Sequence, residues 1–177
     1  MTLRALILAA GRGSRMRHLG DERPKCLVEL AGRPLLERQM AALRRGGCTE
    51  IGVVRGYRGE MLDRPGLHGF SNDRWAETNM VSSLACAASW LREGVVIVSY
   101  ADIFYRAALV RGLAEAPGDL VIAYDRKWRE LWTRRFADPL ADAETFRLDS
   151  RQSPPAARLV KLDRGDLKTQ RLCLRHQ

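Results

Sequence analysis

The sequence predicts a three-layer α/β sandwich, in which helices cover both faces of a mainly parallel sheet. Short apolar runs typical of buried parallel strands alternate with amphipathic helical segments from the N-terminus onward. The first of these runs, Leu6–Ala10, leads directly into a glycine-containing loop. Ligands of open parallel sheets bind outside the carboxyl ends of the strands, so this loop is the expected position of a ligand. At 177 residues, the chain is long enough for one such domain.

The first half of the chain is expected to contribute two strands and one long helix. Residues 3–10 form the first strand, because an uninterrupted apolar run precedes the glycines. Pro34 suits the first turn of a helix, and Gly46-Gly47 ends it. Residues 51–54 are the second strand, whereas residues 55–71 are rich in Gly and Arg and suggest only a short helix near residues 60–63. The apolar face of the long helix is expected to hold Leu35, Leu36, Gln39, Met40 and Leu43.

The second half continues the same alternation of helices and strands. Thr78 or Asn79 caps a helix over residues 80–93. Residues 95–100 then form a third, central strand, a helix follows over residues 107–115, and residues 120–124 are a fourth strand. The buried face of the helix over residues 80–93 is expected to hold Val81, Leu84, Ala85, Ala88 and Leu91.

The pattern changes in the last third of the chain. Trp128, Trp132 and Phe136 recur at helical spacing, which favours an amphipathic helix face that packs on the core. The periodicity then fades and no clear strand is visible. We therefore divide the chain into a domain over residues 1–149 and an irregular or atypical tail over residues 150–177, with an incomplete C-terminal part left open. Such a tail would leave a sheet edge uncovered.

The composition favours a small anionic partner. The formal net charge is +9, and a basic balance attracts nucleotides and phosphorylated metabolites. Because no continuous basic run is interleaved with aromatic residues, we expect no nucleic-acid partner. The N-terminal apolar run is too short to span a membrane and lacks the features of a cleaved signal, so we expect no membrane partner either.

Cysteine usage favours a cytoplasmic location. The cysteines are scattered without a Cys-x-x-Cys pair, so neither a zinc site nor a disulfide framework is indicated. Reduced thiols fit a cytoplasmic protein. The oligomeric state stays open, with a homodimer as one alternative.

The glycine loop predicts a phosphate-rich ligand. Gly11 and Gly13 expose backbone N–H groups that form an anion cradle, and Arg15 and Lys25 add positive charge. A dinucleotide fingerprint is a weak interpretation, because Met16 stands where that motif needs a small residue. The loop also lacks the Gly-Lys-Ser/Thr ending of a Walker motif. An ordinary strand-to-helix turn and a nucleotidyltransferase loop remain as interpretations.

Asp102 is the candidate metal ligand. It follows the third expected strand, so it should face the same crevice as the glycine loop. Mg²⁺ typically takes one or two carboxylates together with substrate phosphates and water. A lone aspartate is more often a turn or cap residue, but the phosphate-binding loop upstream reverses that preference.

The glycine loop also carries a family resemblance. The chain strongly resembles the signature of nucleoside-triphosphate-dependent nucleotidyltransferases in the run Leu8-Ala9-Ala10-Gly11-x-Gly13-Ser14-Arg15-Met16, followed by Pro24-Lys25. On residues 72–79 with Ser83-Leu84, and on Tyr124 with Trp132, it resembles the cytidylyltransferases that act on phosphocholine and related aminoalkyl phosphates or phosphonates. The resemblance covers about residues 3–147.

This resemblance implies a nucleotide-diphospho-sugar transferase-like, Rossmann-like fold and an activity. The activity is Mg²⁺-dependent transfer of a cytidylyl group from CTP to a phosphocholine-like phosphate or an aminoethylphosphonate-like phosphonate, with release of pyrophosphate. Two partners are therefore implied, CTP or another nucleoside triphosphate and a small phosphorylated or phosphonate substrate.

The same resemblance implies roles for individual residues. Arg15 and Lys25 are the catalytic residues, because they neutralise negative charge on the phosphates, and Asp102 holds Mg²⁺. Tyr124 and Trp132 hold the amine of the acceptor through cation–π contacts, and Asp142 or Glu144 can add a counter-charge. The residues expected to contact the nucleotide are Ala10, Gly11, Gly13, Ser14, Arg15, Asn79 and Ser83.

One feature of the family is missing from the sequence. Such enzymes usually supply a second metal carboxylate from a later strand, and none of Asp149, Asp163 and Asp166 is a convincing counterpart. A sugar-1-phosphate nucleotidylyltransferase and a truncated, non-catalytic nucleotide-binding remnant therefore stay open beside the active cytidylyltransferase. On these grounds we expect Mg²⁺-dependent nucleotide binding with weak or absent turnover.

Overall fold

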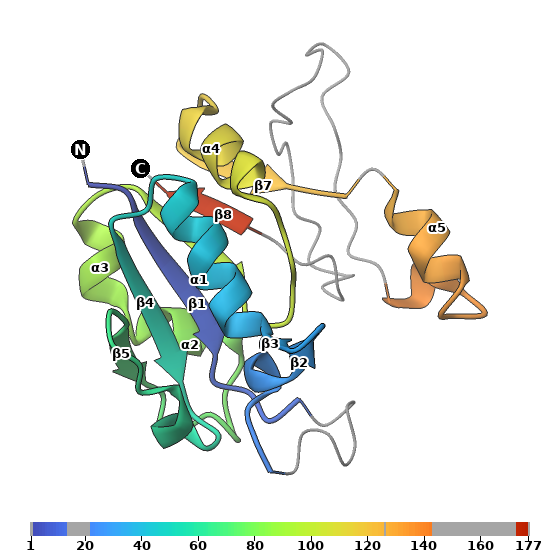
Figure 1. The fold of residues 1–177 in the computed structure, drawn as a ribbon, viewed down its shortest axis with the longest axis horizontal. Coiled ribbons are helices and arrows are strands. Elements are labelled where there is room, and N and C mark those ends of the chain that lie inside the picture. The colour runs from blue at the N-terminus through green and yellow to red at the C-terminus, as the bar shows by residue number, and fades with distance from the viewer. Residues whose placement is uncertain (1, 14–21, 126, 143–172, 177) are drawn as a thin grey trace.

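A six-stranded sheet forms the middle layer of the protein (Figure 1). The computed structural model describes the chain except residues 1, 14–21, 126, 143–172 and 177. β5, β4, β1 and β6 are successive parallel neighbours, whereas β8 runs antiparallel to both β6 and β7. The strands lie in the order β5 (His68–Ser71), β4 (Glu50–Arg55), β1 (Arg4–Ala9), β6 (Val96–Tyr100), β8 (Cys173–His176) and β7 (Leu120–Ala123).

Helices cover both faces of this sheet, which confirms the predicted fold class. α1 (Leu35–Arg45) and α4 (Ala107–Glu115) contact each other on one face, and α2 (Met80–Ala85) and α3 (Ala88–Arg92) lie on the other (Figure 1). α5 (Trp128–Thr133) follows β7 and stands away from the sheet (Figure 1). Among the helices that the structure describes, none combines the length and the apolar character needed to cross a membrane. The short elements are η2 (Lys25–Leu27), β2 (Glu29–Leu30), β3 (Arg33–Pro34), η3 (Gly59–Leu62) and η4 (Pro139–Asp142).

The central strand β1 is apolar on both sides because each side packs against helices. Ala5 and Ile7 belong to the core cluster that includes Leu36 of α1 and Val110 of α4. Leu6 belongs to the opposite cluster, together with Val54, Val96, Val98 and Ala87. Burial on both faces explains why the strand appears in the sequence as a continuous apolar run instead of an alternating one.

The elements predicted in the first 125 residues are confirmed with one exception. The expected helix over residues 80–93 is two helices, separated at Cys86 and Ala87. Its predicted buried face is correct only in part. Leu84 and Leu91 pack against the core. Val81, however, is 67% exposed and Ala85 is exposed as well, whereas Ser83, Ala87 and Trp90 are buried. Trp90 packs against His68 and Phe70 of β5, with ring centroids 5.0 and 5.3 Å apart, and this contact sets which side of the helices faces the sheet.

Two strands have no clear signal in the sequence. β5 is a short edge strand within the Gly- and Arg-rich stretch, and three of its four residues are polar or glycine. β8 lies within residues 150–177, so the expectation that this tail contains no strand is wrong for Cys173–His176. β8 pairs with strands on both of its sides, and it therefore joins β7 to the rest of the sheet. The division into residues 1–149 and 150–177 stays a prediction, because most of the second part lies outside the described residues.

Candidate active site

A pocket of about 260 Å³ opens at the carboxyl ends of β1 and β6. It is lined on one side by the glycine loop that follows β1, and on the other by the residues that follow β6. As expected, the glycine loop and Asp102 face one crevice. Of the residues predicted to bind the nucleotide or the metal, those that line this pocket are Ala10, Gly11, Gly13, Lys25, Asn79, Ser83 and Asp102. Ser14 and Arg15 lie outside the described residues.

The two glycines of the loop differ in whether the fold would tolerate a side chain at their position. Gly13 has φ +72°, and an added Cβ would lie 3.2 Å from Cδ of Lys25, so backbone conformation and packing both favour glycine there. Gly11 is not in the left-handed region, and an added Cβ would meet no described atom within 4 Å. The fold itself therefore does not require glycine at position 11, and its open surface faces the pocket.

Lys25 and Asp102 form an ion pair across the pocket. Lys25 begins η2 and Asp102 follows β6, so the two charges come from segments 77 residues apart. Their side chains are 25% and 18% exposed, so solvent screens the pair only in part. A phosphate that binds Lys25 must compete with this carboxylate, and a cation that binds Asp102 must compete with this ammonium group.

Gln39 of α1 holds the segment that carries Asp102. Its side chain is 1% exposed, and Nε2 donates to the carbonyl oxygens of Tyr100 at 2.7 Å and Ile103 at 2.8 Å. These two bonds bracket Asp102 and fix the turn that follows β6. Gln39 was predicted only as part of an apolar helix face, and the signal for its role is an amide side chain among apolar residues.

Asn79 and Ser83 carry structural hydrogen bonds as well as lining the pocket. The side-chain oxygen of Asn79 accepts from the backbone N–H groups of Val81 and Ser82, at 3.0 and 3.1 Å, which confirms it as the N-cap of α2. The hydroxyl of Ser83 accepts from Nδ2 of Asn72 at 3.0 Å. Their predicted contacts with a nucleotide stay predictions.

Trp75 forms a wall of the pocket. It belongs to the run of residues 72–79 that carries the family resemblance, but no role was predicted for it. Its ring packs against that of Tyr57 in a T-shaped arrangement, with the ring centroids 5.3 Å apart. The backbone N–H of Tyr57 donates to the carbonyl oxygen of Ala10 at 2.9 Å, which ties this wall to the glycine loop. A Cβ on Gly56 would approach that same oxygen to 2.7 Å, so only glycine fits there.

Cys26 lies beside Lys25 in the pocket wall, but its thiol is inert at neutral pH. Burial raises the pKa of Cys26 to about 12. The nucleophilic form is the thiolate, which is therefore scarce at neutral pH. The charged side chains among the described residues that line this pocket are those of Lys25 and Asp102.

A second pocket, of about 400 Å³, adjoins the first and shares Asp102 with it. Its walls come from the end of β7, from α5 and from the segment after Asp102, and they include the predicted acceptor residues Tyr124 and Trp132. The expectation that Trp128 packs in the core is wrong, because no residue of α5 is buried and Trp128 lines this second pocket. Asp142 ends η4, but its side chain is not among those described. The alternative counter-charge, Glu144, lies outside the described residues.

The donor set around Asp102 fits Mg²⁺ only with help from a substrate. No group of three or more His, Cys, Asp or Glu side chains that could hold a metal ion occurs in the part of the chain that the structure describes. One carboxylate beside a phosphate cradle nevertheless matches the usual environment of Mg²⁺, which is bound by few carboxylates and by substrate phosphates.

Comparison with known families identifies the domain type. A model of the MobA-like NTP transferase domain matches residues 5–160. The CTP:phosphoglutamine cytidylyltransferase of Campylobacter jejuni is 38% identical over 156 residues, which are 82% of this chain and 62% of that protein. The choline-phosphate cytidylyltransferase of Streptococcus pneumoniae is 34% identical over 99 residues, which are 54% of this chain and 43% of that protein.

Solved structures agree with the sequence matches. The CTP:phosphocholine cytidylyltransferase of Streptococcus pneumoniae superposes with a TM-score of 0.56 at 25% identity, covering 72% of this chain and 62% of that one. A nucleotidyl transferase from Methanothermobacter superposes with a TM-score of 0.58 at 27% identity, covering 70% and 62%. The chain thus spans less than two thirds of the length of these relatives.

Proposed function

The chain belongs to the MobA-like NTP transferase domain family, and from this premise we propose that it transfers a cytidylyl group from CTP to a small phosphate or phosphonate acceptor. The observation that carries the proposal is a pocket in which a glycine-loop backbone, Lys25 and Asp102 face one another and which adjoins an aromatic pocket through Asp102. The acceptor class is a phosphocholine-like phosphate or an aminoethylphosphonate-like phosphonate. The free cysteines Cys26, Cys48 and Cys86 fit the proposed cytoplasmic location.

The reaction needs no general base. An oxygen of the acceptor phosphate or phosphonate forms a bond to the α-phosphorus of CTP. The bond from that phosphorus to the oxygen bridging toward the β-phosphate breaks, and pyrophosphate leaves with the electron pair. Because the attacking oxygen is already anionic at neutral pH, catalysis consists of positioning the two phosphates and neutralising their charge.

The residues of the first pocket match these two tasks. Backbone N–H groups around Gly11 and Gly13 hold the β- and γ-phosphates, together with Arg15 and Ser14 of the same loop. Lys25 bridges the α-phosphate and the incoming phosphoryl group, so its ammonium leaves Asp102 when both substrates are bound. Gln39 keeps the Asp102 segment in place while that exchange occurs. Asn79 and Ser83 contact the base or ribose.

Asp102 is the protein ligand that we assign to Mg²⁺, with the nucleotide phosphates as the other ligands. The ion, when bound, neutralises charge on the phosphates and on the leaving pyrophosphate. We assign Tyr124 and Trp132 to binding of the acceptor, since aromatic rings bind ammonium groups. The expectation of weak turnover stays a prediction.

One assay tests the proposal. Pyrophosphate release is measured with each of four nucleoside triphosphates against phosphocholine, aminoethylphosphonate and a sugar 1-phosphate, with Mg²⁺ present. Release with CTP and an aminated phosphate or phosphonate is the expected result. Release only with a sugar 1-phosphate, or nucleotide binding without any release, would replace the proposal by a sugar-1-phosphate nucleotidylyltransferase or by a non-catalytic nucleotide-binding domain.

A further inference from the structure

The aromatic pocket already contains a cation of the protein. The guanidinium carbon of Arg135 lies 5.4 Å from the ring centroid of Trp132 and 5.4 Å from that of Phe136. Arg135 also lines the pocket beside Trp132. A substrate ammonium bound at the same indole would therefore lie close to a like charge, which disfavours an acceptor that presents only a cation here.

Arg135 has no carboxylate partner among the residues that the structure describes. Its neighbour Arg134 differs, because a nitrogen of its guanidinium lies 3.0 Å from a carboxylate oxygen of Glu130. Arginine presents a planar fork of N–H donors that matches the two oxygens of a carboxylate. A guanidinium held against an aromatic wall, without a carboxylate partner among the described residues, is therefore a site that a carboxylate of a ligand can complete.

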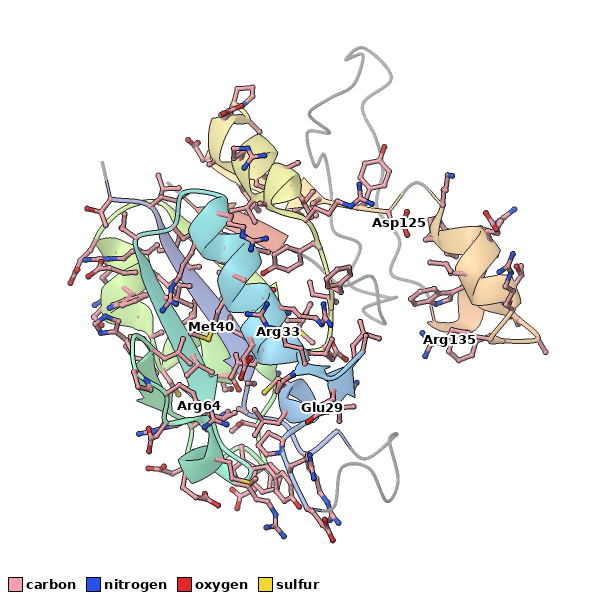
Figure 2. The ribbon with its side chains drawn as sticks, in the orientation of Figure 1. Glu29, Arg33, Met40, Arg64, Asp125 and Arg135 are labelled. Atoms are coloured by element: carbon pink, nitrogen blue, oxygen red, sulfur yellow. The ribbon has the colours of Figure 1, made fainter. Side chains whose placement is uncertain are left out.

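An opposite charge lines the same pocket. Asp125 follows β7, and one oxygen of its carboxylate accepts the backbone N–H of Lys127 at 2.8 Å, which fixes its orientation. Figure 2 shows Asp125 between β7 and α5, and Arg135 just beyond the C-terminal end of α5. Tyr124 precedes Asp125 in the sequence, and both residues line the pocket. An ammonium group is thus better placed near Tyr124 and Asp125 than near Trp132.

We infer that the acceptor carries a carboxylate as well as an ammonium group, as phosphorylated or phosphonylated amino acids do, and that Arg135 is the residue that selects for that carboxylate. The inference rests on the proposed function, since it places the phosphoryl end of the acceptor near Asp102, which the two pockets share. The ammonium group then faces Asp125, and the carboxylate faces Arg135.

Acceptors that differ only in one carboxylate test this inference. O-phosphoserine is phosphoethanolamine with an added carboxylate, and 2-amino-3-phosphonopropionate is aminoethylphosphonate with the same addition. Calorimetry measures the affinity of each for the unmodified protein with Mg²⁺ and a non-hydrolysable CTP analogue. We expect the carboxylate to tighten binding about tenfold in each pair, the usual gain of a charged hydrogen-bonded pair.

Two adjacent arginines provide a matched comparison. Arg135→Gln should bring the affinity ratio within each pair close to one, whereas Arg134→Gln should leave it unchanged, because Arg134 does not line the pocket. Equal affinities in the unmodified protein, absence of binding of all four compounds, or an unchanged ratio in Arg135→Gln would each overturn the inference. Pyrophosphate release is measured in parallel with CTP. A lack of release with every acceptor contradicts the proposed function, while the affinity ratios still decide the inference.

Discussion

The two adjoining pockets are built in different ways. The first is formed by the ends of β1 and β6, whose residues are among the most buried of the chain, and its key segment is fixed by the buried Gln39. The second takes one wall from α5, none of whose residues is buried. Substitutions in the first pocket should therefore affect every substrate alike. Substitutions on α5 should change the choice of acceptor and leave folding intact.

The largest effect is expected from Lys25→Ala. Loss of a charged contact that strengthens in the transition state should raise the barrier by about 3 kcal/mol. Turnover should fall more than nucleotide affinity, because only part of the contact exists in the ground state. Pyrophosphate release and calorimetric CTP binding measure the two quantities. Lys127→Ala, an exposed lysine outside the residues that line either pocket, should change neither. Full turnover in Lys25→Ala would show that Lys25 does not stabilise the transition state.

Gly11→Ala should separate binding from folding. The added methyl meets no described atom within 4 Å, so the melting temperature should stay unchanged, but the methyl would stand where the phosphates approach. We expect a loss of about 2 kcal/mol in nucleotide binding free energy, the scale of one misplaced methyl group. The control is Gly112→Ala on α4, where the added methyl also has open space and which lines neither of the two pockets. Undiminished CTP affinity in Gly11→Ala would exclude this loop as the cradle.

Gln39→Leu should affect the first pocket indirectly, because Gln39 holds the segment that carries Asp102. Loss of the bonds to Tyr100 and Ile103 should lower the free energy of unfolding by about 1–2 kcal/mol. It should also lower turnover with every acceptor by a similar factor, since Asp102 is no longer held between fixed carbonyls. Denaturant unfolding and pyrophosphate release check the two effects. Arg45→Leu, at an exposed position of the same helix, should leave turnover unchanged. A loss of turnover confined to one acceptor would contradict this role.

A further prediction concerns the pH dependence of stability. Burial raises the pKa of Cys26 from 9.0 to about 12, so the folded protein binds this proton more tightly than the unfolded chain. Its stabilising contribution is present below pH 9 and is lost as the pH rises toward 12, by about 1.4 kcal/mol per pH unit. Unfolding curves of the unmodified protein and Cys26→Ala between pH 8 and about pH 10.5 isolate this slope. Equal slopes in both proteins would show that Cys26 ionises freely in the folded state.

Sequence patterns predicted the parts of the molecule that depend on local chemistry. The apolar runs predicted β1, β4 and β6, and the helix over residues 107–115 matches α4. The glycine loop and Asp102 were predicted to meet because parallel strands share a carboxyl edge. These features need no knowledge of distant contacts.

The remaining features depend on contacts between distant segments. The packing of Trp90 against β5 determines which side of α2 and α3 faces the sheet. The apolar periodicity of the helix sequence carries no information about this contact with a distant strand. β8 is a strand because β6 and β7 offer hydrogen bonds on both of its sides. The role of Gln39 could not be predicted from its helix alone, because its hydrogen-bond partners lie in the segment around the end of β6. The role of Trp75 in the pocket wall likewise depends on Tyr57, which belongs to another segment.

Calorimetric titration of CTP, with and without Mg²⁺, tests most directly whether the first pocket is a nucleotide site in which Asp102 holds the metal. The unmodified protein should bind CTP more tightly when Mg²⁺ is present, and Asp102→Asn should lose that gain while retaining weak CTP binding through the glycine loop. Asp119→Asn, an exposed aspartate outside both pockets, should keep the gain. If Asp102→Asn also kept the Mg²⁺-dependent gain, the metal would be held elsewhere and the assignment of this pocket would be wrong.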